Sequence, residues 1–316
     1  MTPLADPAFR ADVLAGLARR PRSIPARWFY DAEGSAWFER ITQLPEYYPT
    51  RTETAILAEC CAAVAEAAGP GRCVVEFGSG SSAKTPVLLG AIAPAAYVGI
   101  DISGDFLRTA CAGLAARFPA MPVLPLEADF LRPIRLPAQV SGLPKLGFFP
   151  GSTIGNMAPA DATDLLRAMR ETLGEGAMLL IGMDRIKDPA VLHAAYDDAQ
   201  GVTAAFNRNL LTRINRELDG TIPVDCFAHH AVWNDTEARV EMHLRATRDM
   251  RFTVAGEPFG IVAGETIHTE NSHKYSRRSA RLLLAAGGWT PVREWSDADD
   301  AFAVILAEAR AVAPAP

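Results

Sequence analysis

Residues 74–85 read Val-Val-Glu-Phe-Gly-Ser-Gly-Ser-Ser-Ala-Lys-Thr, and the next apolar run, 96–100, ends at Asp101. This pattern predicts a strand, a tight turn at Gly78 and Gly80, a helix, and a second strand whose tip carries an acid. Such a turn lets a small molecule approach the backbone closely, and an acid about 20 residues further on suits the diol of a ribose. The stretch predicts a ligand that carries a nucleoside, without saying which one.

Apolar strands alternate with helices around this turn. We expect strands at 73–77, 96–100, 123–127, 145–149 and 178–183, and helices at 52–68, 82–92, 104–118 and 160–173. Short, continuously apolar strands separated by helices indicate a parallel sheet that is covered on both faces. Near the end, a helix at 276–286 and two apolar segments, 289–295 and 301–307, predict that the same sheet resumes.

The segment before the last helix does not continue this alternation of apolar strands and helices. Residues 190–218 read as a helix, and residues 239–246 alternate polar and apolar side chains with a strict period of two, which predicts a strand. Residues 227–233 are expected to pair with it across Asn234-Asp235. Residues 1–51 look irregular but are rich in aromatic residues and proline, so we expect them to pack on the body of the protein.

These patterns predict an α/β protein with two domains. A Rossmann-like parallel sheet closed by an antiparallel C-terminal hairpin is expected to form a ligand-binding domain from residues 52–190 and 283–316. A smaller α+β domain, built from the N-terminal segment and an insertion, is expected to hold the substrate with residues 1–51 and 191–282.

Composition excludes several classes of function. The net charge is −6 and the pI is about 5.6, so nucleic acid is not an expected partner. No apolar run approaches the roughly 20 residues that span a bilayer, and the first 25 residues contain no apolar signal-peptide core. The five cysteines form no CxxC pair and show no metal-ligand spacing, so we expect mostly buried free thiols and no metal. We therefore expect a cytoplasmic monomer.

Three features favour S-adenosylmethionine (SAM) as the nucleoside ligand over a dinucleotide. Glu76, two residues before Gly78, favours a cationic ligand and would repel a pyrophosphate. Asp129 and Phe130 offer a carboxylate and a stacking ring for an adenine at the tip of the third strand. The final hairpin resembles the one that closes the sheet of class I methyltransferases. A purely structural turn, with Ala83 in place of a third glycine, is the alternative.

Residues 146–156 form the next informative run, Leu-Gly-Phe-Phe-Pro-Gly-Ser-Thr-Ile-Gly-Asn. An apolar strand leads into a loop of small residues at the carboxyl end of the sheet, where ligands bind in such folds. Gly151 and Gly155 permit close approach, and the Asn156 side chain both donates and accepts hydrogen bonds. The alternative is that Asn156 caps the helix that follows.

Several motifs make the chain resemble the L-histidine N-alpha-methyltransferase family of ergothioneine biosynthesis, over about residues 21–308. The motifs are Trp-Phe-Tyr-Asp at 28–31, Leu-Pro-Glu-Tyr-Tyr-Pro-Thr-Arg at 44–51, Glu-Phe-Gly-Ser-Gly at 76–80, Phe-Pro-Gly-Ser-Thr-Ile-Gly-Asn at 149–156, Ala-Tyr-Asp-Asp at 195–198, Ala-Phe-Asn-Arg-Asn at 205–209 and Thr-Glu-Asn-Ser-His-Lys-Tyr at 269–275. The tyrosine-proline and glycine-asparagine motifs are specific, since neither is a general methyltransferase feature.

The resemblance implies a substrate site for histidine. Asn156 would contact the α-amino nitrogen, Tyr47 and Tyr196 the carboxylate, and Tyr30 would orient the amine as it gains methyl groups, so that Tyr30 and Asn156 are the expected catalytic positions. Glu270 and Ser272 would bind the imidazole, with Met242 shaping that end of the pocket. From the residues alone, core packing is the favoured interpretation of Met242, and Tyr47 and Tyr48 could both be packing rings. Whether His273 faces the pocket is left open.

On the cofactor side the resemblance implies the residues Gly78, Lys84, Asp101, Asp129 and Phe130, to which the glycine turn adds Glu76 and Gly80. From spacing alone Lys84 could be a solvated helix residue, and Asp101 is assigned by its place at a strand tip.

We therefore expect SAM-dependent trimethylation of the α-amino group of L-histidine, through its mono- and dimethylated forms, to give hercynine, the first step of ergothioneine biosynthesis. Transfer would proceed by in-line displacement. The alternatives are an N-methyltransferase of another amino acid such as a tryptophan derivative, a non-catalytic SAM-binding module, and a nicotinamide oxidoreductase, which Glu76 disfavours.

Overall fold

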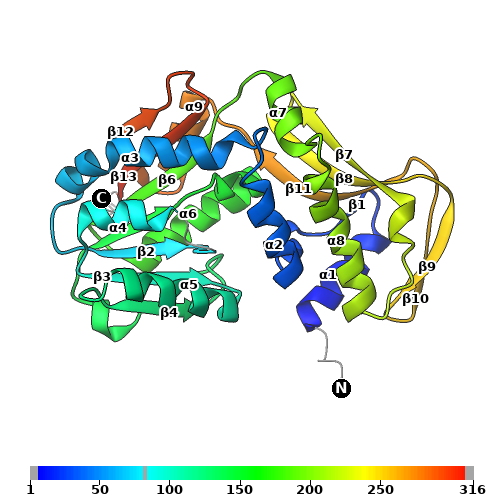
Figure 1. Cartoon of the computed structure of the whole chain (residues 1–316), viewed down its shortest axis with the longest axis horizontal. Coiled ribbons are helices and arrows are strands. Elements are labelled where there is room, and N and C mark those ends of the chain that lie inside the picture. The colour runs from blue at the N-terminus through cyan, green and yellow to red at the C-terminus, as the bar shows by residue number, and fades with distance from the viewer. Residues whose placement is uncertain (1–5, 81–83, 310–316) are drawn as a thin grey trace, which may run out of the picture. The chain divides into compact units, whose positions relative to one another are not determined.

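The computed structural model describes residues 6–80 and 84–309, and these form two compact units (Figure 1). Unit 1 comprises the chain up to Tyr48 together with Lys187–His273, and unit 2 comprises Pro49–Ile186 and the chain from Lys274 onward. The sequence placed the corresponding divisions at 51/52, 190/191 and 282/283. The N-terminal part of the helix expected at 82–92, including Ala83, lies outside the described residues.

Unit 2 contains a seven-stranded sheet in the order β12-β13-β6-β5-β2-β3-β4. Its strands are β2 (Cys73–Phe77), β3 (Ala96–Asp101), β4 (Val123–Glu127), β5 (Lys145–Phe149), β6 (Met178–Asp184), β12 (Trp289–Ser296) and β13 (Phe302–Ala309). The strands β2 to β6 run parallel, and β13 is antiparallel to both β6 and β12. The five parallel strands expected from the sequence are therefore confirmed to within one residue at each end.

Helices cover both faces of this sheet, in keeping with the central strands β2, β5 and β6, which are buried on both sides. The helices α3 (Tyr48–Ala68), α4 (Thr85–Ile92) and α5 (Gly104–Arg117) share a core with Val74 and Tyr97. The helices α6 (Pro159–Leu173) and α9 (Arg277–Ala286) share a second core with Val75 and Val98 on the other face. The neighbours of β2 are β3 and β5, so strand order reverses at β2, which is where ligands bind in open α/β sheets.

Unit 1 is an α+β unit with one apolar core. Its four-stranded sheet has the order β1-β11-β8-β7, with β1 (Arg22–Ser23), β7 (Phe227–Asn234), β8 (Arg239–Ala246) and β11 (Thr266–His273). A separate hairpin joins β9 (Met250–Val254) to β10 (Glu257–Ile261). The helices are α1 (Pro7–Ala18), α2 (Ala32–Ile41), α7 (Pro189–Tyr196) and α8 (Val202–Glu217). The expected pairing of residues 227–233 with 239–246 is confirmed.

Two expectations about unit 1 are wrong. The N-terminal segment is not irregular, since the Asp6 side chain caps the start of α1 and the Asp31 side chain caps the start of α2. The helix expected at 190–218 is two helices, because Asp198 accepts hydrogen bonds from the backbone N–H groups of Val202 (3.0 Å) and Thr203 (2.7 Å) and starts a new helix there.

Candidate active site

The glycine turn after β2 has the backbone that its sequence predicts. Gly78 and Gly80 have φ angles of +71° and +48°, in the region that favours glycine. The Gly78 N–H donates to the Ile100 carbonyl oxygen at 2.8 Å, which ties the turn to β3. A Cβ atom at Gly78 would lie 3.5 Å from the Phe130 ring. The turn and the predicted stacking ring are therefore neighbours.

Asp101 closes β3 and holds the same turn. Its Oδ2 accepts from the Gly80 N–H at 3.1 Å, and its Oδ1 accepts from the Ser103 N–H at 2.9 Å. Each carboxylate oxygen keeps a lone pair beyond these bonds. The structure thus brings Asp101 next to Gly80, as the prediction of a ribose site requires.

Asp129 and Phe130 follow β4 at the same edge of the sheet. Asp129 is exposed, and its Oδ1 accepts from the Leu131 N–H at 3.0 Å. The Phe130 ring packs edge-on against Phe77 and Phe149, with ring centroids 6.3 Å and 5.9 Å away. Packing fixes the ring beside Gly78, which suits a stacking role.

Glu76 lies inside the unit. Its side chain is 2% exposed, and it accepts hydrogen bonds from the Thr85 hydroxyl (2.7 Å to Oε2) and the Tyr97 hydroxyl (2.5 Å). Burial raises the pKa of Glu76 to about 7, although these hydroxyls and the Lys84 charge lower it. The carboxylate joins β2, β3 and α4 beneath the glycine turn, and its effect on a cationic ligand stays a prediction.

Lys84 forms an ion pair with Glu53, a residue that the sequence interpretation missed. Glu53 is 1% exposed, and its two carboxylate oxygens accept from the Gly151 N–H at 3.0 Å and 2.8 Å. Glu53 therefore links α3 to Lys84, the residue that precedes α4, and to the loop that follows β5. Its position was a usable signal, since it shares the buried face of α3 with Ile56 and Leu57.

Asn156 ends the short 3₁₀ helix η3 (Thr153–Asn156) in the loop after β5. This loop turns sharply at Gly151 and Ser152, whose φ angles are +81° and +56°. The N-cap of α6 is Ala158, so Asn156 does not cap that helix and the capping alternative is excluded. Asn156 is the one predicted substrate residue that the structure places in unit 2.

The predicted tyrosines of unit 1 belong to one cluster of rings. Tyr47 lies edge-on to Tyr196, with centroids 6.3 Å apart, and also to Phe38, at 6.3 Å. Tyr30 contacts the same Phe38 ring at 5.7 Å and Phe206 at 5.9 Å. The structure thus brings Tyr30, Tyr47 and Tyr196 together around shared aromatic neighbours.

Glu270, Ser272 and Met242 lie on one face of the unit 1 sheet. Glu270 pairs with Met242 across β11 and β8, and Ser272 pairs with Val240 two residues further along β8. All three side chains are buried. The Ser272 Oγ lies 2.7 Å from the Tyr196 hydroxyl, which links this face to the tyrosine cluster. His273 pairs with Arg239 and lies on the opposite face from Ser272.

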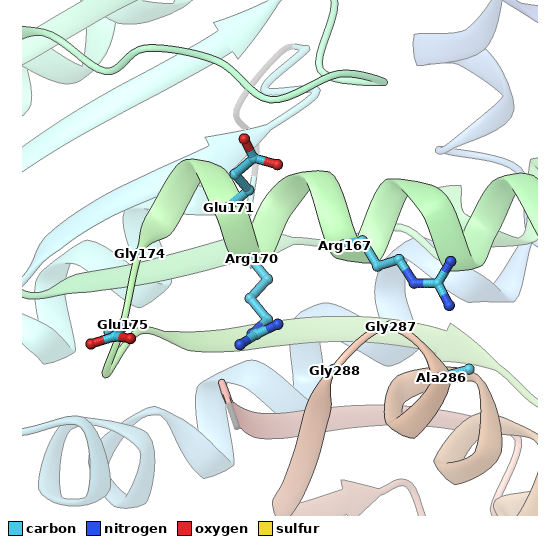
Figure 2. Close-up of a pocket in the computed structure, with 8 residues that line it drawn as sticks. All are labelled: Arg167, Arg170, Glu171, Gly174, Glu175, Ala286, Gly287 and Gly288. Carbon is cyan, nitrogen blue, oxygen red and sulfur yellow. The ribbon is translucent and has the colours of Figure 1, made fainter. Parts of the chain in front are cut away.

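Other features of the described chain do not enlarge this site. A hollow of about 510 Å³ lies in unit 2. Its lining residues, drawn in Figure 2, are Arg167, Arg170, Glu171, Gly174, Glu175, Ala286, Gly287 and Gly288. Arg170 extends toward the Gly287–Gly288 turn, whereas Glu171 leaves α6 on its other side. The hollow lies where α6 ends and leads into β6, which is the amino edge of the parallel strands and not the edge that carries Gly78 and Asp101.

Within residues 6–80 and 84–309, no three side chains of His, Cys, Asp or Glu are grouped as metal ligands. Among the helices of the described ranges, none combines the length and apolar character that a bilayer span requires.

Comparisons with known proteins give consistent matches. A family described as histidine-specific, SAM-dependent methyltransferases matches residues 9–309. The histidine N-alpha-methyltransferase of Mycolicibacterium smegmatis is 42% identical over 306 residues, which cover 95% of this chain and 94% of that protein. The histidine N-alpha-methyltransferase of Mycobacterium tuberculosis is 40% identical with the same coverage. Ergothioneine biosynthesis protein 1 of Neurospora crassa is 29% identical over 92% of this chain and 34% of its own length.

Proposed function

This chain belongs to the family of histidine-specific, SAM-dependent methyltransferases, and on that premise we propose that it transfers three methyl groups in turn from SAM to the α-amino nitrogen of L-histidine. The product is the trimethylated betaine hercynine, which makes the reaction the first step of ergothioneine biosynthesis. The fold expected from the sequence, a parallel α/β sheet closed by an antiparallel hairpin, is confirmed. The assignment of SAM to unit 2 and of the imidazole of histidine to unit 1 belongs to the proposal.

One observation carries the choice of histidine: Glu270 and Ser272 share a buried sheet face with Met242, and Ser272 contacts the Tyr196 hydroxyl. A carboxylate and a hydroxyl, two residues apart on one face, can bind the two imidazole nitrogens at once. An indole offers one N–H and no ring acceptor, so its ring can bind only one of these two groups.

The residues of unit 2 fit SAM. The left-handed backbone at Gly78 and Gly80 and the Phe130 ring beside it suit close approach of a nucleoside, and Asp101 suits the ribose diol. SAM supplies a methyl group on a sulfonium. The exposed Asp129 carboxylate at this edge would favour such a cation, and Glu76 would add to this in its ionised form.

The protein contributes mainly positioning to the reaction. A bond forms between the α-amino nitrogen and the methyl carbon as the carbon–sulfur bond breaks, and S-adenosylhomocysteine leaves. The amine has to be neutral, desolvated and about 3 Å from that carbon, so orientation supplies much of the rate. The amine proton goes to water or to a tyrosine. Tyr30, with the tyrosine cluster, would accommodate the growing cation by cation–π attraction, and Asn156 would orient the amine.

A panel of amino acids tests this proposal. The purified protein is incubated with SAM and each amino acid in turn, and mass spectrometry records the number of methyl groups gained. We expect three methyl groups on histidine and none on tryptophan or its derivatives. Methylation of another amino acid in place of histidine would contradict the substrate assignment, and no methylation of any would support a non-catalytic SAM-binding module. Action as a monomer in the cytoplasm accompanies the proposal as a further expectation.

A further inference from the structure

A β-bulge in β11 determines which face of the sheet carries Glu270. His268 pairs with His243 and Glu270 pairs with Met242, so Thr269 is an extra residue on β11. In a regular strand, residues 268 and 270 would share a face. The bulge instead places Glu270 on the face of Met242 and leaves His268 on the face of His243. The proposed imidazole site therefore depends on this irregularity.

Thr269 anchors the bulge inside unit 1. It is 1% exposed, and its Oγ1 lies 2.9 Å from Asn207 Oδ1 and 3.0 Å from the Met242 carbonyl oxygen. The single hydroxyl proton can be directed at either acceptor. Both acceptors lie on elements that flank the bulge, since Asn207 belongs to α8 and Met242 to β8.

Asn207 extends this anchor to Tyr196. It is fully buried, and its Nδ2 donates to the His243 carbonyl oxygen at 3.1 Å and to His229 Nδ1 at 2.8 Å. His229 therefore accepts at Nδ1 and carries its proton on Nε2, which donates to the Tyr196 carbonyl oxygen at 2.7 Å. This is the neutral imidazole, and burial lowers the pKa of His229 in agreement.

Together these hydrogen bonds form a closed ring of linked residues. It runs from Thr269 through Asn207 and His229 to the backbone of Tyr196, and from the Tyr196 hydroxyl to Ser272, which lies on β11 beyond the bulge. A buried network in which each member has a partner holds one arrangement and penalises others. Slippage of β11 by one residue would move Glu270 to the opposite face.

We propose that Thr269 and Asn207 are positioning residues that set the specificity of the substrate site for imidazole, a role that rests on the proposed function. They contact neither the imidazole nor the methyl donor. They hold Glu270, Ser272 and Tyr196 in the one register and orientation in which a carboxylate and a hydroxyl meet both ring nitrogens.

A matched pair of variants at the bulge separates this role from simple core packing. Thr269→Val keeps the shape of the side chain and removes the hydroxyl, whereas Thr269→Ser keeps the hydroxyl and removes a methyl group. We expect Thr269→Val to raise the KM for histidine at least about tenfold, with the KM for SAM within twofold of the parent. We expect Thr269→Ser to restore a KM within about threefold.

A second pair lies on α8. Asn207→Asp and Asn215→Asp each keep the side-chain acceptor and lose an amide donor, and the Asn215 side chain bonds to the backbone of Ile222, at 2.8 Å and 2.9 Å, away from the bulge. We expect Asn207→Asp to raise the KM for histidine and Asn215→Asp to leave it unchanged. Calorimetric titration with L-histidine in the presence of S-adenosylhomocysteine gives a readout that does not depend on turnover.

The outcomes separate the two proposals. A parent protein that does not methylate histidine contradicts the proposed function itself. An active parent whose Thr269→Val variant keeps its KM and affinity for histidine overturns the positioning role. Equal weakening of histidine binding by the Asn207 and Asn215 variants overturns it too, since that result reflects a general loss of stability.

Discussion

At the scale of single residues, the proposed recognition of imidazole is tested most strongly at Glu270. Glu270→Ala removes a buried hydrogen-bonding group, and leaving its partners unsatisfied costs about 1–3 kcal/mol. We therefore expect the KM for histidine to rise roughly 10- to 100-fold, while SAM affinity, measured by calorimetry, stays within twofold. The matched control is Glu241→Ala, because Glu241 lies on the opposite face of the same sheet. Loss of SAM binding in the Glu270 variant would contradict the division between the two units.

Glu76 gives unit 2 a characteristic dependence on pH. Its pKa in the folded protein, about 7, lies above the ordinary value of 4.5. The folded state therefore holds this proton more tightly, and the resulting stability is complete below about pH 4.5 and is lost as the pH rises through 7. A shift of this size corresponds to roughly 3 kcal/mol.

The variant Glu76→Gln removes this titration. We expect it to be more stable than the parent above pH 7 and to show a flatter profile between pH 4.5 and 7, in urea unfolding followed by circular dichroism. Glu66→Gln on the exposed side of α3 is the control, and its profile should match the parent. A Glu76→Gln protein with the parental slope would show that another group titrates there.

Among the elements, the sequence predicts strands far better than it predicts the elements of unit 1. The five parallel strands are continuous apolar runs that end at glycine or acidic turns, so their bounds are readable. The helix α2 was missed because Gly34 and Ser35 in its first turn resemble a loop signal. The hairpin β9–β10 was missed because β10 contains Pro258 and Gly260.

Some parts of the candidate site could be predicted from the sequence and others could not. The glycine turn, Asp101 and Phe130 were predicted from their places at the ends of apolar runs, and the structure places them together. The hydrogen-bonded ring through Thr269, Asn207 and His229 could not be read from local pattern, since it joins segments far apart in the chain. Glu53 gave a local signal through its place on the apolar face of α3, but its bond to the Gly151 N–H could not be read from that pattern. A bulge also reverses the face that alternation assigns, which no period-two count can reveal.

A substitution of Gly182 on β6 tests whether Glu53, which links α3 to Lys84 and to the loop after β5, supports the SAM site. A Cβ atom there would lie 2.0 Å from Glu53 Oε1, so alanine displaces the carboxylate that binds the Gly151 N–H and Lys84. We expect Gly182→Ala to cost about 1–3 kcal/mol of stability and to weaken SAM binding several-fold. Gly90→Ala in α4 is the matched control, because nothing lies within 4 Å of its Cβ position.

Helix propensity predicts that the control is neutral or more stable by about 0.5–1 kcal/mol. Both variants are compared by thermal unfolding and by calorimetric titration with SAM. Unchanged SAM affinity in a folded Gly182→Ala protein would show that Glu53 has no part in the cofactor site.

At the scale of the whole molecule, we assign SAM to unit 2 and the imidazole of histidine to unit 1. The chain crosses between the units three times, so each is built from segments distant in sequence. Hydrogen exchange measured by mass spectrometry tests the assignment. S-adenosylhomocysteine alone should slow exchange at the turn after β2 and at the ends of β3 and β4. L-histidine, added with it, should slow exchange further in β8, β11 and the segment around Tyr196. Histidine protection confined to unit 2 would contradict the assignment.

The central claim is that three methyl groups are placed on the α-amino nitrogen of histidine. The most direct measurement is tandem mass spectrometry of the product formed from SAM and L-histidine, with S-adenosylhomocysteine quantified in the same reaction. We predict a product that releases trimethylamine on fragmentation and three S-adenosylhomocysteine molecules for each histidine consumed. Methyl groups on the imidazole ring, or a reaction that stops after one transfer, would contradict the claim.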